Sequence, residues 1–285
     1  MNLKSTLGLL LAGLALTPAA AIAADYDPPM VIEQQAAEYV PVEVGSGWYL
    51  RGDVGYAAAT RTSGNFTYRT FDAGTATYSD NLFTTGRLRN DFTFGIGFGY
   101  RLNEWFRADA TVDIFHARFN GTTNSAAPCI DPVFVPAFAG TSCRSEDSQR
   151  AQGLSFLANG YVDLGTYVGI TPYVGAGAGF TRLQWNALSN SSYCVGATCP
   201  TAFVGTATHA GEKSWAFTYA AMAGFAYDVS KNIKLDLGYR YRRIAGGPMF
   251  GFDALSTALG AVGTQGRHPA FSSHEFKVGL RYELW

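Results

Sequence analysis

The C-terminal segment, from Ser273 to Trp285, alternates two kinds of side chain at every second position. One row is His274, Phe276, Val278, Leu280, Tyr282 and Leu284, and the row between is Glu275, Lys277, Gly279, Arg281 and Glu283. Successive side chains of a β-strand point to opposite faces, so the segment predicts a strand with one apolar and one charged face. A chain that repeats this contrast in strand after strand predicts a barrel that is apolar towards lipid and polar towards its own lumen.

The same alternation recurs in seven earlier segments, which are 48–57, 91–102, 105–117, 154–164, 171–183, 215–227 and 233–241. Each is long enough to cross a bilayer when tilted, since about 9 to 11 residues suffice. The connections alternate long and short along the chain, as in outer-membrane barrels with long external loops and short periplasmic turns. We therefore predict an all-β fold, an eight-stranded antiparallel up-and-down transmembrane β-barrel with four long external loops and both termini in the periplasm.

The N-terminal residues predict export. Residues 1–23 combine a basic start at Lys4, an apolar run and a small-residue site, which together are typical of a secretory signal peptide cleaved between Ala23 and Ala24. Residues 24–46 predict a periplasmic lead-in, and residues 47–285 the barrel. No uncharged apolar run of the roughly 18 residues needed for a spanning helix follows the signal. We expect an exported, integral protein of the outer membrane.

In each predicted strand, alternate side chains face lipid and lumen, and we call this assignment the strand parity. It places equal numbers of positive and negative side chains in the lumen. The cations are Arg51, Arg101, Arg107, Lys234, Arg240, Arg242, Lys277 and Arg281, and the anions are Asp53, Asp109, Asp113, Asp163, Asp228, Asp236, Glu275 and Glu283. An eight-stranded barrel is just wide enough for its side chains to fill it. Balanced charges in that space predict an ion-pair network that plugs the lumen, because an unpaired buried ion is costly. The alternative is a narrow small-solute porin, which requires these pairs to open.

Four cysteines, in an exported chain where disulfides persist, allow three pairings. The sequence does not choose among them. We favour Cys129 with Cys143 and Cys194 with Cys199, because each couple lies within one predicted loop. The spacing of Cys194 and Cys199 matches half of a zinc site, but no second ligand pair follows, so we expect no metal and no cofactor.

Charge and histidine placement argue against two other classes of function. A formal net charge of -1 offers no basic patch for nucleic acid. His116 and His274 lie on the lipid-facing parity, and His209 and His268 lie in predicted loops. A catalytic triad needs a nucleophile, a base and an orienting group within hydrogen-bond reach, and no such set is evident. We expect that the protein is not an enzyme. The competing hypothesis is a lipid- or peptide-modifying activity through His116 or His274.

Several segments resemble one protein family. GWYLRGDVGY (47–56), DFTFGIGFGYRL (91–102) and HEFKVGLRY (274–282) are similar to the opacity-protein and OmpA-type small outer-membrane barrels, in particular to immunogenic surface proteins of Gram-negative bacteria. One departure is that Leu284, not an aromatic residue, ends the outward row, with Trp285 following it.

The resemblance implies a monomeric surface protein with a role in adhesion, host contact or envelope integrity. Its implied partners are outer-membrane lipids and lipopolysaccharide, the outer-membrane assembly machinery, and an unknown extracellular ligand bound through the loops. No nucleic acid is implied.

Overall fold

The computed structural model describes residues 47–126, 129, 140–199 and 202–284. The predicted cleavage site at Ala23 and Ala24, the lead-in 24–46 and Trp285 lie outside the described residues. No helix in these described ranges is long and apolar enough to cross a membrane.

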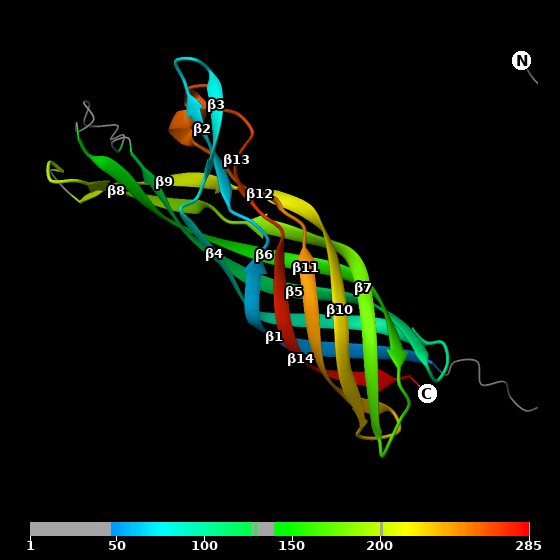
Figure 1. Ribbon diagram of the computed structural model, residues 1–285. Coiled ribbons are helices and arrows are strands. Elements are labelled where there is room, and N and C mark those ends of the chain that lie inside the picture. Colours follow the sequence, from blue (N-terminus) through cyan, green and yellow to red (C-terminus); the bar gives the residue numbers. More distant parts are fainter. Residues whose placement is uncertain (1–46, 127–128, 130–139, 200–201, 285) are drawn as a thin grey trace, which may run out of the picture. The chain divides into compact units, whose positions relative to one another are not determined.

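Eight antiparallel strands form a closed barrel, as predicted (Figure 1). They are β1 (Trp48–Thr62), β4 (Thr85–Arg101), β5 (Phe106–Ser125), β6 (Ser142–Asp163), β7 (Ile170–Trp185), β10 (Lys213–Asp228), β11 (Ile233–Ile244) and β14 (Phe271–Glu283). Each pairs with the next in this order, and β14 pairs with β1 to close the wall. The up-and-down order follows from tight turns at one end, because a short turn can join only neighbouring antiparallel strands.

The short turn between β4 and β5 shows how the sequence encodes these reversals. The side-chain oxygen of Asn103 accepts hydrogen bonds from the backbone N–H groups of Trp105 and Phe106, at 2.9 and 2.8 Å. An Asn that bonds its own backbone two or three residues on stabilises a turn. The strands therefore begin and end where predicted on this side of the barrel, within about two residues.

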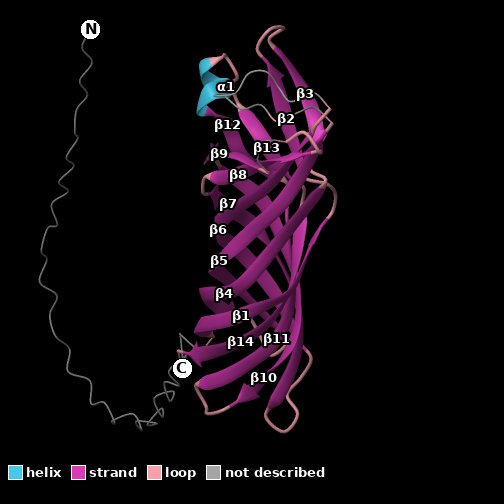
Figure 2. Cartoon of the chain, turned by 90° about the vertical axis from the view of Figure 1, so that its left-hand side faces the viewer, coloured by secondary structure: helices cyan, strands magenta, loops and turns pink. Residues whose placement is uncertain are grey.

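At the other end, the long connections contain secondary structure that the sequence analysis did not predict. In the part of these connections that the structure describes, there are one short helix, α1 (Ala254–Ala258), and six further strands (Figure 2). The strands are β2 (Thr67–Asp72), β3 (Thr77–Leu82), β8 (Leu188–Val195), β9 (Phe203–Gly211), β12 (Gly247–Asp253) and β13 (Thr264–His268). They pair in the order β8, β9, β12, β13, β2, β3 and join the barrel through β6. Residues 151–163 of β6 pair with β7, whereas residues 142–148 pair with β8. The barrel wall thus continues into a second sheet, which we call the outer sheet.

Along β5 the side-chain parity is constant but the chemistry inverts. Below Phe115, buried Asp113 faces inward and exposed Ile114 faces outward; above it, buried Phe119 faces inward and exposed Arg118 faces outward. The same change occurs on β11, where Arg242 is followed inward by Ile244. Lipid solvates an apolar outer surface, but beyond the bilayer only burial inside removes apolar surface from water. The inversion therefore marks where the barrel leaves the membrane.

The inward side above this level holds a hydrophobic core, which we call the outer core. Its buried members are Phe66, Phe83, Leu88, Phe115, Ala117, Phe119, Ala151, Leu183, Trp185, Leu188, Ala216, Ile244, Met249, Phe250 and Phe271. They come from barrel strands, from the outer sheet and from the residues that flank β2 and β3. The ring of Phe119 lies 4.6 Å from that of Phe66 and 5.4 Å from that of Phe83. The outer sheet and the barrel mouth therefore share one core.

Candidate functional site

All sixteen charged residues assigned to the lumen by parity take part in ion pairs in the structure. They form two groups, a continuous chain of eight residues and four separate pairs. Each group carries as many positive as negative side chains.

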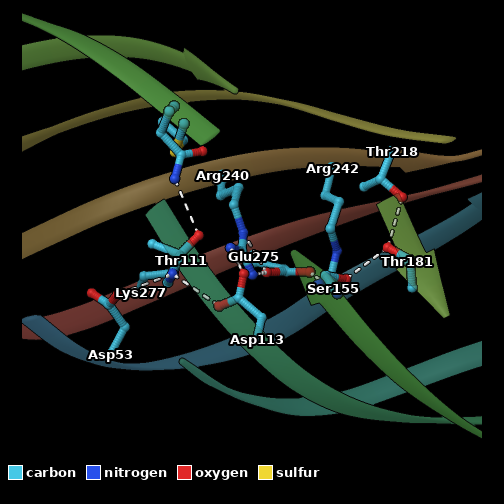
Figure 3. A network of polar contacts seen from close by, with 12 residues as sticks. Asp53, Thr111, Asp113, Ser155, Thr181, Thr218, Arg240, Arg242, Glu275 and Lys277 are labelled. Atoms are coloured by element: carbon cyan, nitrogen blue, oxygen red, sulfur yellow. Dashed lines mark hydrogen bonds and ion pairs between the residues drawn. The ribbon is translucent and has the colours of Figure 1, made fainter. Parts of the chain in front are cut away.

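Figure 3 shows the outer half of this ion-pair chain, which is its most deeply buried part. The guanidinium of Arg240 lies 2.6 Å from a carboxylate oxygen of Asp113 and 2.6 Å from one of Glu275. The other oxygen of Glu275 lies 2.6 Å from Arg242 and accepts a hydrogen bond from Ser273. These four ionised side chains are at most 2% exposed, so each charge is balanced by its charged neighbours and not by water.

Lys277 continues the chain towards the periplasmic end. Its ammonium lies 3.6 Å from Asp113 and 3.4 Å from Asp53. Asp53 in turn contacts Arg51 at 2.8 Å, and Arg51 reaches Asp109 at 2.8 Å. Charges from β1, β5, β11 and β14 are therefore linked across the full width of the lumen.

Four separate pairs occupy the periplasmic part of the lumen, namely Arg107 with Asp163, Arg281 with Asp236, Lys234 with Asp228, and Arg101 with Glu283. The guanidinium of Arg107 also lies over the rings of Tyr161 and Tyr173, at 4.1 and 4.7 Å from their centroids. A cation over an aromatic face is attracted by the ring quadrupole, so the pair of Arg107 and Asp163 is packed as well as charge-matched.

A row of hydroxyl groups separates the ion-pair chain from the outer core. Thr181 is hydrogen-bonded to Ser155 at 2.7 Å and to Thr218 at 2.6 Å (Figure 3). Beside them the guanidinium of Arg242 lies 4.1 Å from the ring centroid of Phe115. The polar side chains of the lumen therefore pack directly against the apolar side chains of the outer core at this level.

A cavity of about 20 Å³ lies within the lumen, lined by Arg51, Asp53, Tyr161 and their neighbours. A cavity needs roughly 10 to 15 Å³ to hold one water molecule. This space therefore fits about one water and no solute of metabolite size.

Both disulfides lie at the end of the outer sheet. Cys129 is bonded to Cys143 and Cys194 to Cys199. Cys143 on β6 stands directly opposite Cys194 on β8 in the strand register. The first bridge therefore ties the connection between β5 and β6 to β6, and the second ties the connection between β8 and β9 to the neighbouring strand β8.

Aromatic and arginine side chains gather at the tip of the outer sheet. The guanidinium of Arg69 lies over the rings of Tyr78 and Phe252, at 4.9 and 5.8 Å, and the ring of Phe71 lies 5.1 Å from that of Tyr78. The Oη of Tyr78 accepts a hydrogen bond from the backbone N–H of Val262 at 3.0 Å. The sequence did not indicate this cluster, because its members come from separate long connections.

Three large aliphatic side chains next to this cluster are open to water. Leu255 and Leu259 are 56% exposed and Val262 is 70% exposed. We call these three residues the apolar tip. Exposed apolar residues beside aromatic and arginine side chains have the composition of protein-binding surfaces.

His274 lies on the outer face of the barrel and not with the hydroxyl of its neighbour Ser273. His274 shares a 2.6 Å hydrogen bond with the Oη of Tyr239 on the outer face, whereas the hydroxyl of adjacent Ser273 donates inward to Glu275. Among the described residues, no group of three His, Cys, Asp or Glu side chains could hold a metal ion.

His268 on β13 lies in the outer core between aromatic rings. Its ring centroid is 5.5 Å from that of Trp185 and 5.7 Å from that of Phe271. Nδ1 lies 3.0 Å from the carbonyl oxygen of Pro269, and Nε2 has no hydrogen-bond partner. Burial lowers the pKa of His268 to about 4.

A pH-dependent stability follows from this depressed pKa. Above pH 6.5 the ring of His268 is neutral in both the folded and the unfolded state, so the protein has its full free energy of unfolding. This free energy decreases as the pH falls towards 4, because the unfolded state binds the proton first. Between pH 7 and pH 4 the wild type should lose up to about 3 kcal/mol more than the non-titrating His268→Gln variant. Chemical unfolding of both proteins at each pH measures this difference, and parallel pH profiles would contradict it.

The chain is similar to several known proteins. The family model of the outer membrane protein beta-barrel domain matches residues 8–283. An uncharacterized protein of Brucella suis is 33% identical, with 100% of both chains covered. A protein named "Putative adhesin" in Rickettsia bellii is 26% identical over 83% of this chain and 88% of its own. The crystal structure of Neisserial surface protein A aligns with a TM-score of 0.39 and 16% identity, over 83% of this chain and 97% of that one.

Proposed function

Because the chain belongs to the outer membrane protein β-barrel family, we propose that it is a surface-interaction protein whose outer sheet binds a partner outside the cell. It is an integral protein of the outer membrane. The apolar tip and the aromatic cluster beside it bind this partner, and the protein catalyses no reaction.

The apolar tip is the observation that carries this proposal. Leu255, Leu259 and Val262 leave large apolar surfaces in water, at the end of a sheet whose interior is otherwise well packed. Exposure of this kind is unfavourable in the unbound state and favours the burial of these side chains by a partner. The "Putative adhesin" relative supports adhesion or host contact as the form that this binding takes.

A binding assay on whole cells tests the proposal. Bacteria displaying the wild-type chain should adhere to cultured epithelial monolayers, and the Leu255→Ser, Leu259→Ser, Val262→Ser variant should adhere at least tenfold less. Val195→Ser is the matched control, because Val195 is 48% exposed on β8 but lies outside the apolar tip. Equal adhesion of the tip variant and the wild type at equal surface display would overturn the proposal.

We also propose that the lumen is plugged. The support is the continuous ion-pair chain, the single-water size of the cavity beside it and the outer core above it. Opening a path would separate buried charges, which costs several kcal/mol per ion.

Electrical recording tests the plug against the porin alternative. Purified full chain reconstituted in planar bilayers should give no stable single-channel conductance. Steady openings that persist after the protein is repurified in the folded state would favour a small-solute channel instead.

A further inference from the structure

The four cysteines gather around the paired strands β6 and β8. The Sγ of Cys129, which is bonded to Cys143 on β6, lies 3.3 Å from the carbonyl oxygen of Tyr193 on β8. The next residue of β8 is Cys194, which stands directly opposite Cys143 and is bonded to Cys199. The two disulfides therefore lie side by side, and we call these four residues the cysteine cluster.

Cys143 and Cys194 occupy a cross-strand position that also suits a disulfide. The backbone N–H of Cys194 donates a 2.8 Å hydrogen bond to the carbonyl oxygen of Ala202, next to β9 and away from β6. Cys143 and Cys194 are therefore a non-hydrogen-bonded pair of β6 and β8, and the Cα atoms of such pairs lie about 4.5 Å apart. A disulfide spans Cα separations of about 4.4 to 6.8 Å. The sheet thus holds these two cysteines at a separation that a disulfide can bridge.

The cysteines differ in their access to an external reagent. Cys129 and Cys194 are only 6% and 7% exposed. Cys143 is half-buried but lies inside the sheet, with β5 paired on one side of it and β8 on the other. Cys199 is also half-buried, but it follows the exposed residues 195–198 and lies beyond the end of β8. Accessible disulfides are the labile ones, so an external thiolate attacks this cluster at the Sγ of Cys199.

Attack at Cys199 releases the thiolate of Cys194 directly beside Cys143. Strand pairing holds Cys194 opposite Cys143 whether or not a disulfide is present, whereas Cys129 lies beyond the end of β5 at Ser125. Even two groups joined by a short flexible linker meet at an effective concentration on the order of millimolar. The released thiolate is therefore placed to displace Cys129 from Cys143.

We propose that the cysteine cluster is a thiol-exchange site, which takes up a thiol from outside the cell as a mixed disulfide on Cys199. First the external thiolate bonds to the Sγ of Cys199, and the Cys194–Cys199 bond breaks with its electron pair on Cys194. Then the thiolate of Cys194 bonds to the Sγ of Cys143, and the Cys129–Cys143 bond breaks with its electron pair on Cys129.

The exchange needs no oxidant and no reductant. Two disulfides are consumed and two are formed, and the negative charge of the external thiolate ends on Cys129. The second step retains the captured thiol, because Cys194 is then bonded to Cys143 and no longer free to expel it from Cys199. The site does not include the apolar tip, so it is independent of the partner proposed there.

Disulfide mapping by mass spectrometry tests the proposal, with glutathione as the probe. The folded full chain in detergent micelles is incubated with glutathione, quenched with acid, alkylated with N-ethylmaleimide and digested. The wild type should carry glutathione on Cys199, a Cys143–Cys194 disulfide and alkylated Cys129. Unchanged native disulfides, glutathione on Cys143, or an adduct on Cys199 beside an intact Cys129–Cys143 disulfide would each overturn the proposal.

Removing the first disulfide separates capture of the thiol from its retention. In the Cys129→Ser, Cys143→Ser variant, the only disulfide that Cys194 can attack is the mixed disulfide on Cys199. After free glutathione is removed, this variant should therefore retain about tenfold less adduct than the wild type. Retention equal to that of the wild type would contradict the second step.

Two single variants test the strand register without any added thiol. Cys199→Ser leaves Cys194 free opposite Cys143, so a Cys143–Cys194 disulfide should form and Cys129 should become available to N-ethylmaleimide. Cys194→Ser is the matched control, because its free Cys199 lies outside the paired strands and the Cys129–Cys143 disulfide should persist. Circular dichroism should show the same strand content in all of these proteins. The same disulfides in both single variants would contradict the role of the register.

Discussion

Replacing Glu275 with Gln should lower the free energy of unfolding by about 3 to 5 kcal/mol. Glu275 is the only carboxylate within ion-pair distance of Arg242 among the described residues, and it shares Arg240 with Asp113. The substitution preserves the shape of the side chain but leaves two buried guanidinium groups with one carboxylate between them. Urea titration of the folded protein in phospholipid vesicles, followed by tryptophan fluorescence, measures the change.

Glu146→Gln is the control for this experiment. Glu146 pairs with Arg144 at 3.2 Å on the outer surface, with both side chains more than half exposed. A surface pair contributes about 1 kcal/mol or less. If the Glu275 and Glu146 variants lose equal stability, the lumen pairs are hydrated and the barrel is not filled as described.

Replacing Phe119 with Ala should lower the free energy of unfolding by a similar amount, about 3 to 5 kcal/mol. The ring is 0% exposed and contacts Phe66 and Phe83, which belong to the connection between β1 and β4. Its removal leaves a cavity where the outer sheet packs on the barrel mouth. Chemical unfolding measures the loss, and hydrogen exchange should become faster in β2 and β3.

Leu255→Ala serves as the comparison, because it removes apolar atoms from a side chain that is already 56% exposed on α1. Its effect should stay within about 0.5 kcal/mol. If Phe119→Ala leaves the exchange of β2 and β3 unchanged, the outer sheet is not held by this core.

The barrel could be predicted from the sequence because lipid and lumen impose opposite chemistry on alternate residues. In β14, each step of two from His274 to Tyr282 repeats that contrast, and the strand appears where expected. The same alternation predicts which charged side chains face the lumen. It could not give the partners, since Arg240 on β11 meets Asp113 on β5 across 127 positions of sequence. These two strands are not paired, and only the closure of the barrel brings the two side chains together.

The outer sheet could not be predicted in this way. Strands such as β8, LSNSSYCV, have short polar side chains on both faces, so the sequence carries little alternation. The predicted third strand was also too short, because the outward side chains after Ala117 become polar while β5 continues to Ser125. The strand continues above Ala117, but its outer face there contacts water and no longer lipid, so the apolar alternation ends before the strand does.

Clusters of side chains on the surface could not be predicted from the sequence for a related reason. Arg89, Arg118 and Arg150 are unremarkable singly and form a row only through the pairing of β4, β5 and β6. Tyr78 meets Val262 only because β2 and β3 pair into the same sheet as β13.

The most direct test of the account is a nitroxide scan of β5 in lipid vesicles, with single labels at Ala110, Val112, Ile114, His116, Arg118 and Asn120. These outward positions should collide with oxygen, which concentrates in acyl chains, up to Ile114, and with a water-soluble nickel chelate from His116 onwards. Labels at the inward Asp113 and Phe119 should collide weakly with both. Access of the nickel chelate to Ala110 and Val112 would contradict the assignment of this face to lipid.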